Sequence, residues 1–263
     1  MKTFQINYSM ELLFSKPVEH HYFTLKCLPK TQPRQQVISN KIYVNSEYFS
    51  LSQDCFRNNI IYGNTIGKHD TFSVSIRSVV QVDWTQYDRD DSLLPVFLKQ
   101  TEATSLSSHM KQCLVELELL THGLNTYEKA IYFSKYIFEY MTYEKGATGI
   151  NTSGKMAFEN KKGVCQDYAH ILIGFLRESG IPARYVAGIM NGEKYTHAWV
   201  EFYANGYWYG TDPTNNLLID DNYVIFSKGR DHKDTLINKG VFYGMNVSQK
   251  QNIEISIEEV IYD

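Results

Sequence analysis

The chain has 263 residues, of which 43% are hydrophobic, 21% charged and 14% aromatic, and its formal net charge is −3. This length and composition suit a globular protein of one large or two small domains, able to bury a core without disulfide bonds. A weakly acidic chain without a basic block argues against nucleic acid as a partner.

The four cysteines, Cys27, Cys55, Cys113 and Cys165, form no C-x-x-C pair and no zinc-type spacing with histidine. We therefore expect no metal and, in the absence of a glycine-rich phosphate loop or a flavin motif, no cofactor. The first residues alternate polar and apolar, unlike a signal peptide. No stretch approaches the roughly 18 apolar residues of a membrane span. Together these features predict a cytoplasmic protein with reduced thiols and no membrane partner.

Residues 1–82 have the pattern of β-strands. Apolar residues recur with period two, as expected for strands with one buried face. The clearest run is Phe4, Ile6, Tyr8, Met10, Leu12 and Phe14, and the pattern returns at residues 23–27 and 72–82. Turn-forming residues separate the runs. These residues are predicted to form a small antiparallel β domain.

Residues 83–106 are polar and begin with several aspartates, so we interpret them as a connector. Helical periodicity follows, with a first helix around residues 110–117. Asn125 and Glu128 have the spacing of a capping box, which predicts a second helix start. The apolar residues after it fall on one helical face and are expected to be core: Ala130, Phe133, Ile137 and Met141.

A third helix is predicted to begin near Cys165 and to stop at Gly180, which Pro182 follows. Cys165 then lies in the first helical turn, where unpaired backbone N–H groups and the helix dipole favour a thiolate. The thiolate is the nucleophilic form of cysteine. The alternative interpretation is a buried structural cysteine, which is common for this residue type.

Two strands, residues 195–203 and 207–214, flank Asn205-Gly206, a strong hairpin signal. A two-residue loop pairs Ala204 with Tyr207. In that register His197 and Asp212 are diagonal neighbours on one face of the hairpin, close enough to hydrogen bond. A slip of one residue would move Asp212 to the other face.

A cysteine at a helix start, a histidine and an aspartate can form a nucleophilic triad. We therefore predict Cys165, His197 and Asp212 as catalytic residues. The histidine takes the thiol proton, and the aspartate fixes the orientation of the imidazole.

Four further residues near this predicted site need an interpretation. His170 faces away from Cys165 around the predicted helix and is interpreted as a packing residue. Asp167 suits a capping role in the first helical turn. Trp199 shares the face of His197 and is a candidate wall of the site. Tyr143 is a candidate source of the second oxyanion donor, beside the Cys165 backbone N–H.

Four segments resemble those of bacterial transglutaminase-like proteins: residues 163–170 around Cys165, 180–186, 196–201 around His197 and 211–215 around Asp212. The order Cys, His, Asp is the order of that family. The first 80 or so residues are similar to the β-rich N-terminal domain of many bacterial members. Residues 229–234 and 239–242 resemble the closing segment, with His232 where an aromatic residue such as tyrosine is expected.

The resemblance implies an α+β fold, with a β-rich domain at 1–82, the connector at 83–106 and a papain-like core at 107–263. That core would contain an antiparallel sheet, the catalytic helix and a C-terminal β segment. It also implies acyl transfer from peptide or protein amides through a thioester. Resolution by water makes a cysteine protease or amidase, which the bacterial two-domain group favours.

Other functions remain open at this stage. Resolution of the thioester by an amine would make a protein-glutamine amine transferase, that is, a transglutaminase. A non-catalytic binding module on the same fold and an arylamine N-acetyltransferase are further alternatives. Calcium dependence is not implied, because no ligand-dense acidic loop is present. The oligomeric state is undetermined by the sequence.

Overall fold

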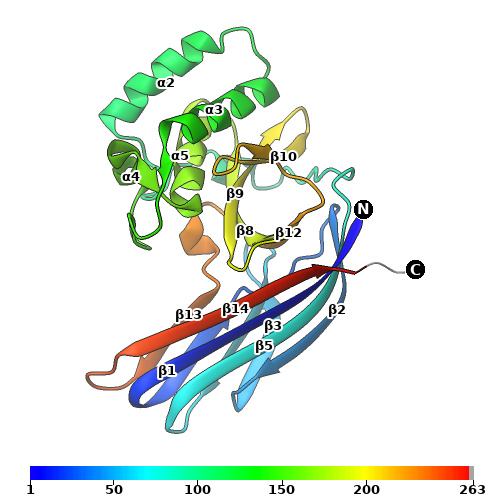
Figure 1. Ribbon diagram of the computed structural model, residues 1–263, viewed down its shortest axis with the longest axis vertical. Coiled ribbons are helices and arrows are strands. Elements are labelled where there is room, and N and C mark those ends of the chain that lie inside the picture. The colour runs from blue at the N-terminus through cyan, green and yellow to red at the C-terminus, as the bar shows by residue number, and fades with distance from the viewer. Residues whose placement is uncertain (261–263) are drawn as a thin grey trace.

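The computed structural model describes residues 1–260, which contain two large sheets, one small two-stranded sheet and a group of helices (Figure 1). The first sheet has the order β2-β5-β1-β4-β3, with two further strands, β13 and β14, also paired to β1. Its strands are β1 (Lys2–Leu25), β2 (Gln35–Val44), β3 (Tyr48–Gln53), β4 (Asn59–Thr65), β5 (His69–Val82), β13 (Asn238–Tyr243) and β14 (Gln249–Glu259).

The long strand β1 organises this sheet. Its alternating apolar residues are buried as predicted, from Phe4 at 0% exposure to Phe14 at 7%. The first half of β1 pairs with β5, and its second half pairs with β4. A register shift between Leu13 and Val18 marks the change of partner. The period-two pattern therefore gave the strand and its buried face correctly.

The C-terminal β segment lies in this same sheet, although the sequence analysis groups it with the core. β14 pairs with β1 without interruption from Phe4 opposite Glu259 to Phe14 opposite Gln249. β13 pairs with the second half of β1. Figure 1 shows β14 beside β1, so the first and last strands are neighbours. Alternation identifies a strand but carries no information about its partner.

The second sheet is antiparallel with the order β11-β10-β9-β8-β12. Helices α2 to α5 lie together on one side of it (Figure 1). The strands are β8 (Ala183–Met190), β9 (His197–Ala204), β10 (Tyr207–Asp212), β11 (Leu217–Leu218) and β12 (Tyr223–Gly229); the helices are α2 (Ser108–Leu120), α3 (Thr126–Tyr140), α4 (Gly154–Asn160) and α5 (Cys165–Glu178). The α+β class predicted from the sequence is confirmed.

Local helix signals are also confirmed. Asn125 caps α3 by accepting the Glu128 N–H, while the Glu128 side chain accepts the Asn125 N–H. The connector contains one short helix, α1 (Leu94–Phe97). The remaining short elements are β6 (Thr142–Tyr143), β7 (Lys162–Gly163) and the 3-10 turn η1 (His232–Asp234). No helix within residues 1–260 is long and apolar enough to cross a membrane.

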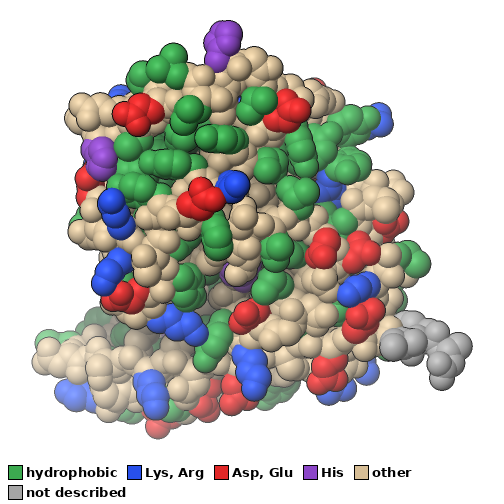
Figure 2. Space-filling view, turned by 45° about the horizontal axis from the view of Figure 1, so that its top comes forward, with side chains coloured by type: hydrophobic (Ala, Val, Ile, Leu, Met, Phe, Trp, Pro, Cys, Tyr) green, Lys and Arg blue, Asp and Glu red, His purple; other side chains and the backbone are tan. Residues whose placement is uncertain are grey.

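One hydrophobic cluster joins the two sheets. It contains the buried face of β1 together with Trp199 of β9 and residues 223–226 of β12. A second cluster fills the space between the helices and the other face of the second sheet. On the face shown in Figure 2, apolar side chains gather over the helical part, and charges of both signs are interspersed. The second sheet is thus buried on both faces.

Candidate active site

Cys165 is the first residue of α5, as the sequence predicts. The preceding Val164 has extended backbone angles, φ −117° and ψ 179°, so the chain enters the helix abruptly at the cysteine. Asp167 Oδ2 accepts the Val164 N–H at 2.8 Å and the Thr148 hydroxyl at 2.6 Å. The predicted capping role of Asp167 is therefore confirmed, and it fixes the position of the thiol at the helix start.

Gly163 allows this cap to form. A Cβ atom built on Gly163 would lie 2.6 Å from Asp167 Oδ2, closer than any side chain could tolerate. Gly163 also belongs to β7, which pairs in parallel with β6 through Tyr143. A glycine is required here because the Asp167 carboxylate occupies the space of a side chain.

The hairpin that carries the other two predicted residues has the expected register. Asn205 and Gly206 both have positive φ, 51° and 84°, as a type I′ turn requires. Ala204 is paired with Tyr207. This register brings His197 Nε2 to 2.7 Å from Asp212 Oδ2.

Asp212 is fully buried and surrounded by hydrogen-bond donors. Besides His197, the backbone N–H groups of Thr214 and Asn215 donate to Oδ1, at 2.9 and 3.3 Å. The Asn215 side-chain amide and the Tyr223 hydroxyl donate to Oδ2, at 2.8 and 3.0 Å. Burial alone would raise the pKa of Asp212, but these donors and the imidazole lower it. The carboxylate is therefore held charged and in one orientation.

The pKa of His197 is shifted in the opposite direction to that of Asp212. Burial opposes the protonated imidazole, but the Asp212 carboxylate and the Cys165 thiol outweigh it and raise the pKa of His197 to about 10. Because Nε2 donates to Asp212, Nδ1 is the ring nitrogen available to exchange a proton with the Cys165 thiol. The arrangement holds a positive charge beside Cys165, which is what thiolate chemistry needs.

Cys165 and His197 lie where two cavities meet. The larger, about 600 Å³, is lined by Tyr143, Lys145, Glu193, Tyr195, Thr196, Thr214 and Asn215 as well as the pair itself. The smaller, about 310 Å³, extends toward His232 of η1, residues 235–238 and Ile253 of β14. The nucleophile candidate is thus reached from both sides, and the first sheet contributes to one of them.

Two other residues singled out from the sequence, His170 and Tyr143, can now be placed relative to the site. His170 is buried, and its Nε2 accepts the His232 N–H at 3.2 Å. Burial, with a contribution from His232, lowers the pKa of His170 to about 3, so it is a neutral packing residue. Tyr143 lines the larger cavity and is 47% exposed.

Trp199 does not wall the site. It is fully buried and lines neither cavity. Its indole stacks on the His197 ring at 6.2 Å between centroids and meets the Tyr223 ring edge-on at 5.2 Å. Trp199 shares the His197 face as predicted, but that face is covered by the first sheet there, so the indole supports the imidazole from behind.

The sequence analysis missed two partners of Asp212. Asn215 lies three residues after it, and the tight turn could have indicated a side chain folding back. Tyr223 begins β12, whose pairing with β8 places it under the hairpin. No sequence pattern near Tyr223 predicts this position under the hairpin. Within residues 1–260, no group of three or more His, Cys, Asp or Glu side chains is arranged to hold a metal ion.

Comparison with known proteins identifies the family of both parts of the chain. Residues 117–213 match the family model of the transglutaminase-like superfamily. Residues 4–81 match that of the bacterial transglutaminase-like N-terminal region. The solved structure of a candidate cysteine protease from Cytophaga hutchinsonii superposes with a TM-score of 0.79 at 20% identity, covering 100% of this chain and 92% of that one. At 20% identity, this similarity shows that the two proteins share a fold.

Two curated relatives extend the comparison. An uncharacterised protein of Mycobacterium leprae is 23% identical over 261 residues, covering 91% of this chain and 93% of the relative. A protein-glutamine gamma-glutamyltransferase of Pseudomonas aeruginosa is 36% identical over 86 residues, covering 28% of this chain and 13% of that enzyme. The chain thus carries a transglutaminase-like core preceded by a bacterial transglutaminase-like N-terminal region.

Proposed function

We propose that this protein is a cysteine-dependent acyl-transfer enzyme in which Cys165 is the nucleophile, His197 the acid and base, and Asp212 the residue that orients His197. The observation that carries the proposal is the meeting of the His197–Asp212 pair with the start of α5 in one cleft. A charged imidazole beside a thiol at a helix N-terminus is suited to generating a thiolate.

The chemistry follows from these positions. The Cys165 thiolate attacks an amide carbonyl carbon, forming a C–S bond and a tetrahedral oxyanion. As the intermediate collapses, the C–N bond breaks and His197 gives its proton to the leaving amine. A thioester remains on Cys165. His197 then removes a proton from the incoming water or amine, which attacks the thioester and releases the thiolate.

The Cys165 backbone N–H is available to stabilise the oxyanion, because the first N–H groups of a helix have no partner within it. Tyr143 supplies the second donor in this proposal, from its place on the wall of the larger cavity. Asp212 itself touches no substrate, since it is fully buried behind His197.

We propose hydrolysis of peptide or protein amides as the reaction, which makes the protein a cysteine protease or amidase. A cleft open on both sides of Cys165 suits an extended substrate that passes through it. The similarity of one segment to a protein-glutamine gamma-glutamyltransferase favours amine transfer as the second candidate. Both reactions proceed through the same thioester.

Iodoacetamide labelling at neutral pH tests the catalytic assignment. We expect Cys165 to react well before Cys27, Cys55 and Cys113, as measured by peptide mass mapping over time. Cys55 is the informative comparison because it is exposed, whereas Cys27 is buried. The His197→Ala variant should slow the labelling of Cys165 alone. Labelling of Cys165 no faster than that of Cys55 would contradict the proposal and favour a non-catalytic binding module.

A mass-spectrometric screen of peptides and glutamine amides, with and without an amine acceptor, identifies the reaction. Chain cleavage or deamidation supports hydrolysis, and incorporation of the amine supports the second candidate. The Cys165→Ala variant is the control and should produce none of these products. Product formation by that variant would refute Cys165 as the nucleophile.

A further inference from the structure

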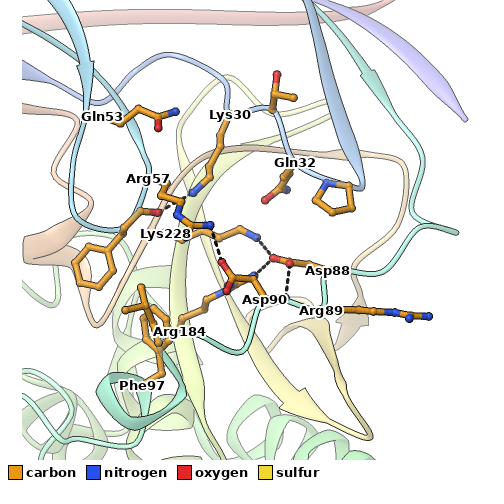
Figure 3. Close-up of a pocket in the computed structure, with 14 residues that line it drawn as sticks. Lys30, Gln32, Gln53, Arg57, Asp88, Arg89, Asp90, Phe97, Arg184 and Lys228 are labelled. Carbon is orange, nitrogen blue, oxygen red and sulfur yellow. Dashed lines mark hydrogen bonds and ion pairs between the residues drawn. The ribbon is translucent and has the colours of Figure 1, made fainter.

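A third cavity, of about 450 Å³, lies away from Cys165, where the two parts of the molecule meet. Its walls come from the loop after β1, the turn between β3 and β4, the connector, β8 and β12. Figure 3 shows these residues converging on one space. Arg184 of β8 pairs with Glu201, which is four residues along β9 from His197. The cavity therefore lies farther along the second sheet than the cleft of Cys165, and the two share no lining residue.

Cations dominate the lining of this cavity. Lys30, Arg57, Arg89, Arg184 and Lys228 contribute five positive charges, against two carboxylates, Asp88 and Asp90. In Figure 3 the side chain of Arg89 points away from the others, while the remaining four cations lie around the cavity. The buried carboxylate of Glu201 beneath them adds a third negative charge. A positive excess remains.

The carboxylates are already engaged. Arg184 Nη2 lies 2.7 Å from Asp88 Oδ2 and 2.6 Å from Glu201 Oε2. Lys228 Nζ lies 2.9 Å from Glu201 Oε2. Asp88 and Glu201 are thus already paired with Arg184 or Lys228, so neither carboxylate is left to neutralise another cation.

Of the four cations around the cavity, Lys30 is the one without a counterion among the described residues. Its ammonium donates to the Phe56 carbonyl at 2.8 Å and makes no ion pair within the part of the chain that the structure describes. Burial, with repulsion from Lys228 and Arg184, lowers the pKa of Lys30 to about 7. Burial and the neighbouring Arg184 likewise lower the pKa of Lys228 to about 8. An anion in the cavity would relieve both effects, since a buried charge is costly unless it is paired.

The other walls define the kind of anion. Phe56, Phe97, Leu93 and Pro33 provide an apolar side, and Gln32 and Gln53 provide amide groups. Binding sites for small molecules combine such apolar walls with a few polar groups and commonly measure about 300–1,000 Å³. Clustered Lys and Arg donors suit phosphate oxygens.

We propose that this cavity binds a small phosphorylated organic molecule, with its phosphate group between Lys30, Arg57 and Lys228 and its organic part against Phe56 and Phe97. The phosphate takes the place of the missing counterion of Lys30. The site is distinct from that of the acyl-transfer chemistry, because it shares no lining residue with the two cavities at Cys165 and His197.

Isothermal titration calorimetry at slightly acidic pH tests this site, with inorganic phosphate and phenyl phosphate as probes and sodium chloride of equal ionic strength as the reference. We expect saturable binding of both phosphates, with phenyl phosphate the tighter ligand because it also uses the apolar wall. No saturable heat from either probe at millimolar concentration would overturn the proposal. Equal affinity for the two probes would overturn the proposed contact between the organic part of the ligand and the apolar wall.

The Lys30→Met variant separates binding from a structural role. We expect its dissociation constant for phenyl phosphate to rise about tenfold or more, as for loss of a charge-assisted hydrogen bond. Its melting temperature in chloride should be unchanged or higher, because an uncompensated buried charge is removed. Lys41→Met, on the exposed face of β2, is the matched control and should bind normally.

Arg57 provides a second variant should Lys30→Met fail to fold. Its side chain is 69% exposed and, among residues 1–260, forms an ion pair only with Asp90, at 3.1 Å, so Arg57→Gln should leave the fold intact. We expect weaker binding of both phosphates. Wild-type affinity in the Lys30→Met or Arg57→Gln protein would overturn the proposal.

Discussion

At the scale of single residues, the pairing of His197 with Asp212 decides the chemistry of the cleft. The carboxylate is buried and receives hydrogen bonds from four groups besides the imidazole. It therefore remains charged and stabilises the imidazolium. Because the pKa of His197 is raised above its ordinary value of about 6.5, its protonation stabilises the fold. That contribution is complete below the ordinary pKa and is lost as the pH rises toward about 10.

The protonation state of His197 can be followed directly. In an NMR titration of the ring nitrogens we expect His197 to remain an imidazolium at neutral and mildly alkaline pH, and to titrate only near pH 10. His170, whose pKa is lowered to about 3, should stay neutral over the same range and serves as an internal contrast. In Asp212→Asn the pKa of His197 should fall, because the carboxylate that stabilises the cation is gone. An unchanged titration in that variant would contradict the pairing.

Tyr223 is a positioning residue, since it acts on His197 through Asp212. Tyr223→Phe removes one hydrogen bond to a buried carboxylate, which should lower the free energy of unfolding by about 1.5–3 kcal/mol. Urea denaturation measures this loss. The exposed Tyr43→Phe is the control and should change stability by less than about 0.5 kcal/mol. Equal effects of the two substitutions would show that the hydroxyl does not support Asp212.

At the scale of elements, the start of α5 determines where the thiol lies. Gly163, Val164 and Asp167 form a compact entry to the helix, in which a carboxylate replaces the side chain that residue 163 lacks. The hairpin of β9 and β10 is likewise determined by neighbouring residues, since its two-residue turn fixes the register of the two strands. Two short local structures therefore carry the whole candidate triad.

Gly163→Ala should disturb this entry. The new Cβ would meet Asp167 Oδ2 at 2.6 Å, so the cap must open and the first turn of α5 must shift. We expect iodoacetamide labelling of Cys165 to slow by about tenfold or more, with a stability loss of about 1–3 kcal/mol from the lost hydrogen bond. Gly149→Ala is the matched control, because a Cβ there meets no atom within 4 Å. Wild-type labelling in Gly163→Ala would refute the role of the cap.

At the scale of the whole molecule, the two sheets share one hydrophobic cluster, and both ends of the chain lie in the first sheet. Residues 223–226 of β12 pack in the same cluster as β1. The ion network of Arg184, Glu201, Lys228 and Asp88 joins the connector to the second sheet. The two parts should therefore not unfold independently.

We expect a single cooperative transition in urea. Tryptophan fluorescence reports on Trp84, Trp199 and Trp208, whereas far-UV circular dichroism reports on both sheets and the helices. Both should give the same midpoint. Ile257→Ala, in β14, should move both midpoints together, with a cost of about 2–5 kcal/mol for a buried isoleucine. The half-exposed Ile253→Ala should cost less. Separate transitions for the two probes would refute the coupling.

Much of the candidate site was predictable because its signals are local. A glycine, a cysteine and an apolar helical run identify the start of α5, and Asn205-Gly206 fixes the pairing that joins His197 to Asp212. The capping box at Asn125 was predictable for the same reason. In each case the interacting groups are separated by few residues, so the sequence pattern and the structure describe the same contacts.

The remaining features depend on contacts between distant segments. The sequence by itself determined the strands with clear alternation, the starts of α3 and α5, the hairpin register and the candidate residues Cys165, His197 and Asp212. Only the tertiary structure decided that β14 pairs with β1, that Tyr223 lies beneath Asp212 and that Lys30 faces Lys228. The physical reason is that periodicity and turn chemistry fix which face of a segment is buried, whereas packing of the whole chain selects the segment that covers it.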